Sequence, residues 1–277
     1  MLSRLPVRDA RPRGYQSVSD RPPPLPFDAI RGDVRSFLTA EGRVFADLGD
    51  GEFGCRAAGF ERDGSRYFVK FAVHEMGVAS QRRAITVHER VQHPALIPLI
   101  QVLEGDRGPI LVFPWCDASP LRQSQRMRQA PLSDVIRAIR DVIDVHRVID
   151  EAGFVSIDLY DGNLLYRDRV FLIDVDEYRP APFRLDTPRT LGSTRFMAPE
   201  EFHQGAWLDS RTMVFQLGRA MAVLLDPPRG EYPDRCPALG PVIRQATAPD
   251  PEARYPTVAD LTAGLDAALA RAGLSPP

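Results

Sequence analysis

The sequence predicts an α+β protein in which the strands come first and the helices later. Up to about residue 115, short apolar runs alternate with turns that contain glycine and aspartate, which is typical of β-strands. From about residue 133 onward, apolar residues recur at helical spacing over longer stretches. Strands followed by helices indicate an α+β architecture. We expect a small β-rich lobe and then a mostly helical lobe, with the boundary near Trp115 to Ser119.

Length and composition are those of an ordinary globular protein, with 277 residues, 44% apolar and 26% charged. The net charge of −2 gives no reason to expect nucleic acid or an anionic membrane as a partner. The three cysteines are far apart and match neither a disulfide framework nor a zinc spacing. With no signal-peptide core and no apolar run long enough for a membrane span, we expect a cytoplasmic protein with reduced thiols.

Residues 1–26 are polar and rich in proline, and they end in Arg-Pro-Pro-Pro-Leu-Pro. Such a stretch cannot bury enough apolar surface to order itself, so we expect a flexible leader. A polyproline docking peptide is the alternative interpretation of this segment.

The elements expected before residue 115 are a short helix, a strand into glycine, two strands joined by Asp63-Gly64, a helix, and two further strands. Their ranges are Phe27 to Asp50 for the first two, then Cys55 to Phe60, Arg66 to Ala72, Val78 to Val91, Leu96 to Val102 and Pro109 to Trp115.

In the second part, Ser133 can cap a helix that runs to about Ala152. The apolar face of that helix is Val135, Ile136, Ile139, Val142, Ile143 and Ile149. The stretch Phe154 to Asp176 then reads as a loop, a tight hairpin and a second loop. Further helices are expected near residues 210–226, 239–247 and 257–272.

The stretch 154–176 contains the polar groups that could hold a metal or a proton, namely Asp158, Asn163 and Asp174. Asn163 is the only asparagine of the chain, and Lys70 is the only lysine among its 35 lysine and arginine residues. The composition has all but lost both residue types, so each survivor marks a place where Arg, Gln or Asp would not serve. Phosphoryl transfer needs one such lysine and one such asparagine together.

A glycine-rich segment, residues 49–54, contains Gly49, Gly51 and Gly54 between two expected strands. Its bare backbone N–H groups could approach the oxygens of a triphosphate, although the same pattern also occurs in ordinary hairpins. The following residues alternate as a strand and reach Lys70, 16 positions after Gly54. A dinucleotide-binding loop would instead require a helix at that point.

These motifs, in this order, resemble the eukaryotic-type Ser/Thr protein kinases of bacteria over roughly residues 41–272. The matching segments are the glycine loop, the strand ending in Lys70, His93-Pro94, Asp158 with Asn163, Asp174-Val175-Asp176, Gly192 to Glu200, and Asp250 to Arg254. The resemblance implies a two-lobed protein kinase-like fold. The lobes would be residues 27–115, which bind nucleotide, and residues 116–277, which carry catalysis.

The resemblance also implies roles for individual residues. Lys70 would neutralise the phosphates of ATP, and Asn163 and Asp174 would hold Mg²⁺ or Mn²⁺. Asp158 would accept the proton of the substrate hydroxyl. The adenine would lie behind Phe113, near the backbone of Trp115 and Cys116, with Leu165 beneath it. Ser193 lies in the segment typical of kinases that act on proteins, and Glu200 would pair with Arg254.

Several positions depart from the family's pattern. Ile157 stands where the arginine beside the catalytic aspartate is expected, so no receptor for an activating phosphate is built in. Met213 replaces the aspartate that normally steadies this loop, and Tyr160 replaces a lysine. Asp176 stands in place of a glycine, where it stiffens a hinge and could add a metal contact.

The acidic partner expected for Lys70 on the helix near residues 78–91 is missing, because Ala84 occupies its position. Glu89 and Glu75 are the two candidates for that partner. Only a short Pro- and Gly-rich segment joins the helices near 226 and 239, where the family has a helix that docks protein substrates.

Three hypotheses for the function follow. The first is an active kinase that transfers the γ-phosphate of ATP to a protein hydroxyl, or to itself. The second is a pseudokinase that binds nucleotide or serves as a scaffold. The third is a kinase for a small molecule.

Overall fold

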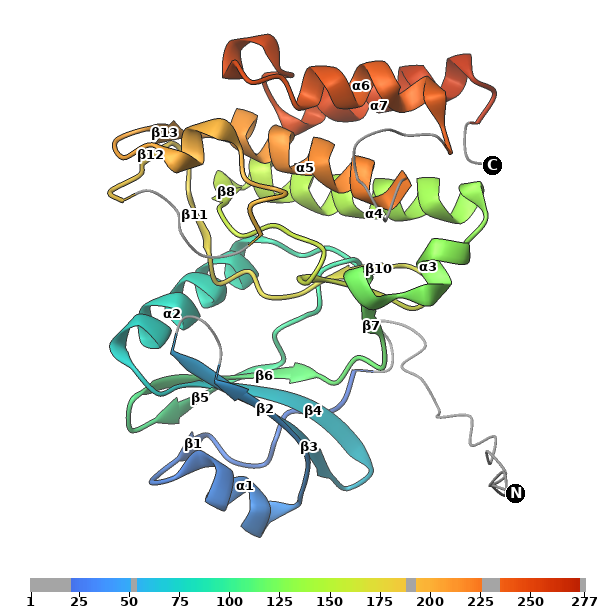
Figure 1. Ribbon diagram of the computed structural model, residues 1–277. Helices are drawn as coiled ribbons and strands as arrows, with labels where there is room; N and C mark the ends of the chain where they lie inside the picture. The colour runs from blue at the N-terminus through green and yellow to red at the C-terminus, as the bar shows by residue number, and fades with distance from the viewer. Residues whose placement is uncertain (1–20, 51–53, 188–192, 226–234, 275–277) are drawn as a thin grey trace, which may run out of the picture.

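The computed structural model describes residues 21–50, 54–187, 193–225 and 235–274. A β-sheet with two helices forms one part of the molecule, and most of the other helices form the second part (Figure 1). We call these the sheet region, residues 21–114, and the helical region, residues 119–274. The expected α+β class is confirmed.

The sheet has six strands in the order β1-β5-β6-β4-β3-β2. All neighbouring pairs are antiparallel except β1 with β5. The strand bounds are Ala29–Ile30 for β1, Arg43–Asp50 for β2, Cys55–Arg62 for β3, Ser65–Ala72 for β4, Gln101–Gly105 for β5 and Gly108–Pro114 for β6.

The turn between β3 and β4 sets the register of the hairpin that carries Lys70. Asp63 and Gly64 both have positive φ, 49° and 75°, which is the geometry of a type I′ turn. The right-handed twist of this turn matches that of the two strands, so β3 and β4 pair without a break from Arg62 and Ser65 to Cys55 and Ala72. The hairpin therefore places Lys70 opposite Ala57 on one side and Leu111 of β6 on the other.

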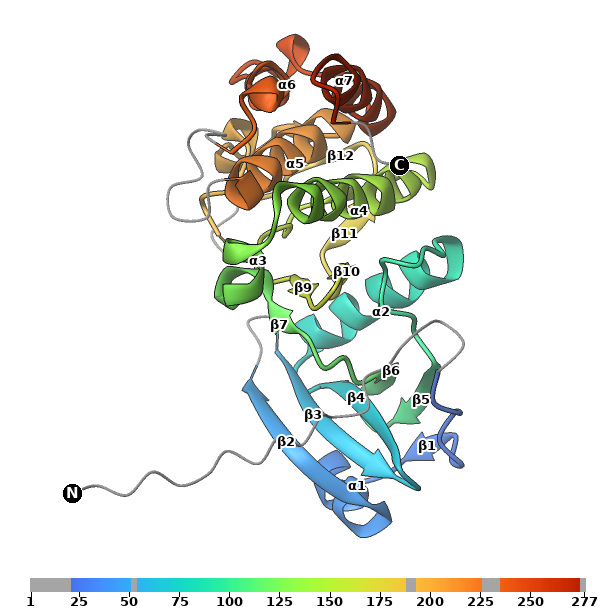
Figure 2. The ribbon, with the colours of Figure 1, turned by 90° about the vertical axis from the view of Figure 1, so that its right-hand side faces the viewer.

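Two helices accompany the sheet. Helix α1 (Val34–Glu41) packs on β2 and β3, and the Asp33 carboxylate caps it by accepting a hydrogen bond from Ser36 N at 2.8 Å. Helix α2 (Glu75–Arg90) packs against β4 and β6 and faces the helical region (Figure 2).

The last residues of the expected leader belong to the fold. Leu25 is buried in the apolar cluster of the sheet, and its N–H donates to Gln101 Oε1 at 2.8 Å. Tyr67 donates its hydroxyl hydrogen to Pro23 O. The prolines from 22 to 26 thus belong to the fold, because they hold an extended backbone that Gln101 can pair with; residues 1–20 lie outside the described residues.

The prediction of a strand from Leu96 to Val102 is wrong for residues 96–100, since β5 begins only at Gln101. Residues 95–97 pair with the helical region instead. Leu172 N donates to Ala95 O at 2.6 Å, and Ile97 N donates to Leu172 O at 3.1 Å. Their backbone groups are satisfied across the interface between the two regions, so they cannot also join the sheet.

Short elements connect the sheet region to the first long helix of the helical region. They are β7 (Ser119–Pro120), a 3₁₀ turn (Leu121–Gln123) and α3 (Gln125–Gln129). Helix α4 spans Leu132–Glu151 and begins after Pro131, so Ser133 lies in its first turn and is not its cap. Proline fits at a helix start because the first N–H groups have no partner within the helix.

The core of the helical region consists of α4, α5 (Ser210–Leu225), α6 (Gly240–Ala246) and α7 (Val258–Arg271), stacked as Figure 1 shows. All six apolar residues predicted for the face of α4 are buried. Helix α5 is buried on almost every side, and Met213 within it is fully enclosed. None of the helices among the described residues is long and apolar enough to cross a membrane.

Three small sheets belong to the helical region. Strand β8 (Phe154–Ser156) pairs with β11 (Tyr178–Pro180), and β9 (Leu164–Tyr166) pairs with β10 (Val170–Leu172) and β7. Strand β12 (Phe183–Arg184) pairs with β13 (Trp207–Leu208). The expected loop, hairpin and second loop over residues 154–176 are confirmed, and β9 and β10 form the hairpin.

Candidate functional site

A cavity of about 310 Å³ lies between the sheet region and the β9–β10 hairpin. Its walls are mainly apolar and include Leu48, Phe68, Leu96 and Ile97. Of the residues expected at the site from the sequence, Lys70, Phe113, Trp115, Cys116, Leu165 and Asp174 line it, and Asp158 and Asn163 are not among its lining residues. Residues separated by as many as 104 positions therefore meet around one cavity, as the motif pattern predicted.

Lys70 forms an ionic network with two aspartates at one end of this cavity. Its Nζ lies 2.9 Å from Asp174 Oδ1 and 2.5 Å from Asp176 Oδ2. Burial alone would lower the pKa of Lys70, but the charges of Asp174 and Asp176 hold it above its usual value. The ammonium is thus charged, and it lies beside two anions.

The two aspartates differ in their surroundings. The Asp174 side chain is 42% exposed, whereas that of Asp176 is 7% exposed. Burial, and then repulsion by Asp174, raise the pKa of Asp176 to about 7. For Asp174, burial acts in the same direction, but the ammonium of Lys70 outweighs it and the pKa falls below its usual value.

The backbone of Asp174 has a φ of 59°, in the left-handed region that residues other than glycine seldom adopt. A residue held there costs about 1–3 kcal/mol, and such positions cluster at functional sites. Because Ile173 N donates to Asn163 O at 2.9 Å, the residue before Asp174 is tied to the loop that carries Asn163.

Asp158 and Asn163 contact each other across the loop between β8 and β9. The amide nitrogen of Asn163 donates to Asp158 O at 2.9 Å and to Asp158 Oδ2 at 3.4 Å. Asn163 is buried, and Asp158 is partly exposed. The amide nitrogen orients the carboxylate, which leaves the amide oxygen as the end of Asn163 suited to a cation.

Tyr160 covers this loop from the side. A Cβ atom on Gly162 would lie 2.3 Å from Tyr160 Cε2, so only glycine fits beneath the ring. Where the family's pattern has a lysine, the ring of Tyr160 packs against Gly162, the residue before Asn163.

The glycine-rich segment is only partly described, because Gly51 lies outside the described residues. Gly49 and Gly54 both have a φ of 71°, and adjacent Leu48 lines the cavity. Gly54 O accepts hydrogen bonds from Val73 N at 2.8 Å and from His74 N at 3.3 Å. The end of the segment is thereby fixed to the residues that join β4 to α2.

Ser193 lies in the turn before Phe196, whose N–H donates to Ser193 O at 3.0 Å. It is not among the residues that line the cavity. The structure thus places Ser193 apart from the cavity wall, and residues 188–192 before it lie outside the described part of the chain.

Neither candidate glutamate of α2 provides the carboxylate that Lys70 contacts. Glu75 and Glu89 are both exposed, and Ala84 lines the cavity as the missing acidic position implied. Helix α2 reaches Lys70 through Gln81, whose Nε2 donates to Lys70 O at 2.9 Å. The sequence reasoning missed Asp176 as a partner of Lys70; the signal was a second carboxylate two residues after Asp174, in an otherwise apolar run.

Ile157 packs in a small apolar cluster with Leu185 and Leu208, and Phe183 packs against it. The segment that follows β11 is therefore held near Asp158 by apolar contacts, where an arginine is missing.

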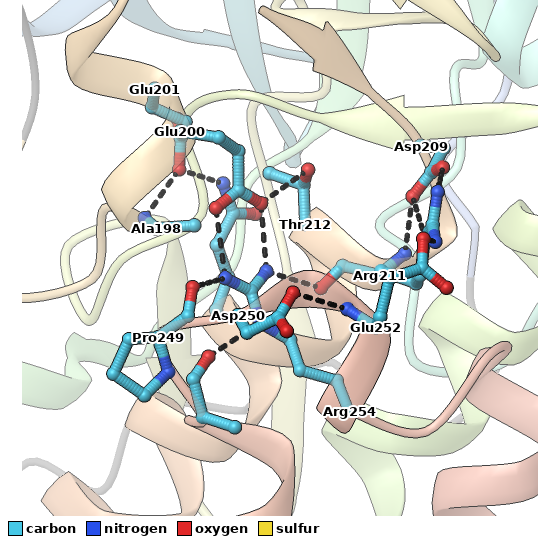
Figure 3. A network of polar contacts seen from close by, with 12 residues as sticks. Ala198, Glu200, Glu201, Asp209, Arg211, Thr212, Pro249, Asp250, Glu252 and Arg254 are labelled. Atoms are coloured by element: carbon cyan, nitrogen blue, oxygen red, sulfur yellow. Dashed lines mark hydrogen bonds and ion pairs between the residues drawn. The ribbon is translucent and has the colours of Figure 1, made fainter.

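The predicted pair of Glu200 and Arg254 is confirmed and lies at the centre of a larger network (Figure 3). The Arg254 side chain is fully buried, and it also donates to the carbonyl oxygens of Ala248, Pro249 and Arg211. Thr212 Oγ1 donates to Glu200 Oε1 at 2.8 Å. The network joins the turns before α5 and α7.

Within the described residues, no group of three or more His, Cys, Asp and Glu side chains is arranged to hold a metal ion. Asp174 and Asn163 nevertheless offer a carboxylate and an amide oxygen, the hard donors that Mg²⁺ prefers. With water and phosphate oxygens to complete the shell, two such donors suffice, so the residues fit a metal that binds together with a nucleotide. No known protein-family model matches this chain.

Proposed function

We propose that the chain is an ATP-dependent phosphotransferase with a two-lobed protein kinase-like fold. The observation that carries the proposal is that Lys70 and Asp174 meet at one mainly apolar cavity, whose lining residue Ile173 is bonded through its N–H to Asn163 O in the loop that also carries Asp158. The only lysine and the only asparagine of the chain both belong to this group. A fold that had lost the chemistry would have no need to keep either of them.

The apolar part of the cavity suits the adenine. Phe113, Leu165 and the segment Trp115–Cys116 line it, and ring stacking with apolar walls stabilises a flat aromatic base. Trp115 N already donates to Arg66 O at 3.0 Å, so the hydrogen bonds that recognise the base fall to other backbone groups of residues 114–116. Lys70, at the other end, would contact the phosphates.

Asn163 and Asp174 are the residues that would hold Mg²⁺ or Mn²⁺ with the nucleotide. When bound, the metal neutralises phosphate charge and so favours transfer. Asp158, oriented by the amide of Asn163, would position the acceptor hydroxyl and take its proton.

A protein hydroxyl is the acceptor that we favour, on another protein or on the chain itself. The support is the segment around Glu200, which the buried Arg254 holds and which reaches the loop of Asp158 through Arg195, 3.7 Å from Asp161. The lobes would be residues 27–115 and 116–277. The stretch that would lack a docking helix falls on residues 226–234, outside the described residues. We place the enzyme in the cytoplasm because its thiols pair with no other cysteine.

The test is incubation with γ-labelled ATP and Mg²⁺ or Mn²⁺, followed by measurement of label on the chain and on added proteins. Asp158→Asn should leave ATP affinity nearly unchanged and lower transfer by roughly 10²–10⁴-fold. Asn163→Ala should weaken nucleotide binding that depends on metal, and more so at low Mg²⁺.

Three results would contradict the proposal in different ways. Equal transfer by Asp158→Asn would refute the catalytic assignment. Nucleotide binding without any transfer would identify a pseudokinase. ATP turnover that rises with an added metabolite, with no label on protein, would identify a small-molecule kinase.

A further inference from the structure

We propose that Asp176 is the residue that positions Lys70, in place of an acidic residue on α2. The inference rests on the proposed function, since it explains how the lysine is held toward the phosphates. It makes Asp176 a positioning residue that acts through Lys70.

Asp176 is better suited to this role than Asp174. Its Oδ2 lies 2.5 Å from Lys70 Nζ, and its side chain is nearly buried. Asp174 is more exposed and is the carboxylate that would coordinate the metal. A metal held by Asp174 competes with Lys70 for that carboxylate, whereas Asp176 remains at the ammonium. The lysine therefore keeps a carboxylate partner while Asp174 serves the nucleotide.

Helix α2 cannot supply that partner itself. Ala84 and His88 are the residues of α2 that line the cavity, and neither has a carboxylate. Glu75 and Glu89 are exposed, at the two ends of the helix. A buried ammonium without a carboxylate is strongly unfavourable, so the position of Asp176 meets a need that the sequence of α2 creates.

In the family's pattern, the helix at the position of α2 contributes an acidic residue to the contact with the lysine. Here α2 contributes the cation, Arg83, which donates from Nε to Asp176 O at 2.7 Å and from Nη2 to Glu177 Oε1. Ser80 donates to the same oxygen of Glu177 at 2.9 Å, and Glu177 is buried. The helix thus holds the backbone of Asp176, and Asp176 holds Lys70.

The consequence is a continuous chain of contacts from α2 to the lysine. Arg83 fixes the carbonyl of Asp176, the carboxylate of Asp176 fixes Nζ, and Gln81 fixes the carbonyl of Lys70. Two substitutions relative to the family's pattern, an alanine in α2 and an aspartate at position 176, compensate each other. Helix α2 thus remains linked to Lys70, but the carboxylate of the link is on Asp176 and α2 contributes Arg83.

The experiment measures the affinity of the full chain for Mg·ATP and for adenosine by calorimetry. The variants are Asp176→Asn, Lys70→Met and the double variant, with Glu89→Gln as the control for loss of an exposed carboxylate on α2. Asp176→Asn should weaken Mg·ATP binding at least about 10-fold and leave adenosine binding within about twofold, because only the phosphates contact Lys70. The double variant should bind Mg·ATP no worse than Lys70→Met.

Two results would overturn the inference. One is wild-type affinity for Mg·ATP in Asp176→Asn. The other is the same fold-loss from Asp176→Asn in the Lys70→Met background as in the wild type, which would mean that Asp176 acts without the lysine, for example on the metal.

If the wild-type chain binds no Mg·ATP, the proposed function fails. Urea unfolding of the wild type, Asp176→Asn, Lys70→Met and the double variant then decides whether Asp176 holds Lys70. A shift of the unfolding midpoint in the double variant that is smaller than the sum of the two single shifts supports the contact. Additive shifts would refute it.

Discussion

Glu200 accepts two hydrogen bonds from one guanidinium, with Arg254 Nη1 at 2.7 Å from Oε1 and Nη2 at 2.8 Å from Oε2. All three nitrogens of Arg254 donate to protein oxygens. The two residues form a bidentate buried ion pair, in which each charge is compensated only while the other is present.

Arg254→Ala should destabilise the chain by about 3–5 kcal/mol, because it leaves the Glu200 carboxylate partly buried without its cation. Urea unfolding at pH 7.5 measures the change. Arg244→Ala removes an exposed arginine of α6 and should change stability by less than about 0.5 kcal/mol. A loss in Arg254→Ala as small as that of the control would show that the network is not structural.

Ile157→Ala should lower stability by about 2–5 kcal/mol, since the side chain is buried between Leu185 and Leu208. Limited proteolysis should also cut the segment between Phe183 and Leu208 faster. Val102→Ala, at an exposed position of β5, is the matched control. Unchanged cleavage in Ile157→Ala would mean that the cluster does not hold the segment.

Phosphatase treatment should leave transfer activity unchanged, because an isoleucine stands where a phosphate-binding arginine would be needed. The assay compares treated and untreated chain with labelled ATP. A large loss after dephosphorylation would indicate that another arginine serves as the receptor. Arg184, which donates to Gly205 O at 3.0 Å, is the described candidate, and Arg189 lies outside the described residues.

His146 should make stability depend on pH between about 4 and 6.5. Its Nδ1 donates to Val142 O, its Nε2 accepts from the Tyr178 hydroxyl, and burial lowers its pKa to about 4. The unfolded chain, with a pKa near 6.5, binds the proton first, so stability is full above about pH 6.5 and falls as the pH drops toward 4. The contribution of His146 to the loss from pH 7.5 to pH 5 should be about 2 kcal/mol.

His146→Gln should reduce this dependence in urea unfolding measured at the two pH values. His88, whose pKa burial also lowers to about 4, acts in the same direction as His146, whereas Asp176, whose pKa is raised to about 7, acts in the opposite direction. Identical pH dependence in the variant and the wild type would show that His146 is not the titrating group.

Cys116 should react slowly with iodoacetamide, because burial raises the pKa of its thiol to about 11. At pH 8 only about one thiol in 1,000 would be ionised, against roughly one in four for an ordinary cysteine. Mg·ATP should slow the reaction further, since Cys116 lines the cavity. Mass spectrometry of the peptide with Cys116 measures both effects. Equal rates with and without nucleotide would place the ligand elsewhere.

Periodicity and turn chemistry were enough to predict most of the fold. The face of α4, the turn at Asp63-Gly64 and the hairpin at 164–172 follow from local rules of spacing and backbone geometry. The start of β5 could not be predicted, since the partner of Ala95 and Ile97 is Leu172, a residue distant in the sequence. The cap of α4 was misjudged because proline serves there as well as serine.

For the candidate site, the motif spacing predicted that Lys70 and Asp174 lie together and that Glu200 pairs with Arg254. It could not predict the partner of Lys70, because an ion pair depends on which carboxylate points inward. Asp176 and Glu89 look equally able to pair in sequence, and only burial separates them.

The backbone contacts at Leu172 also bear on how the molecule can move. Leu172 is bonded to Ala95 and Ile97, and His93 Nε2 lies 2.9 Å from Asp144 Oδ2 of α4, so the chain after α2 is anchored to the helical region. Rigid-body rotation of the sheet against the helices must then be taken up near residues 98–99 and 118, because Ile100 N donates to Val112 O and Asp117 pairs with Arg66 of β4. Because the cavity is bordered by Ile97 on one side and by Trp115 and Ala118 on the other, bending at this double hinge opens or narrows it.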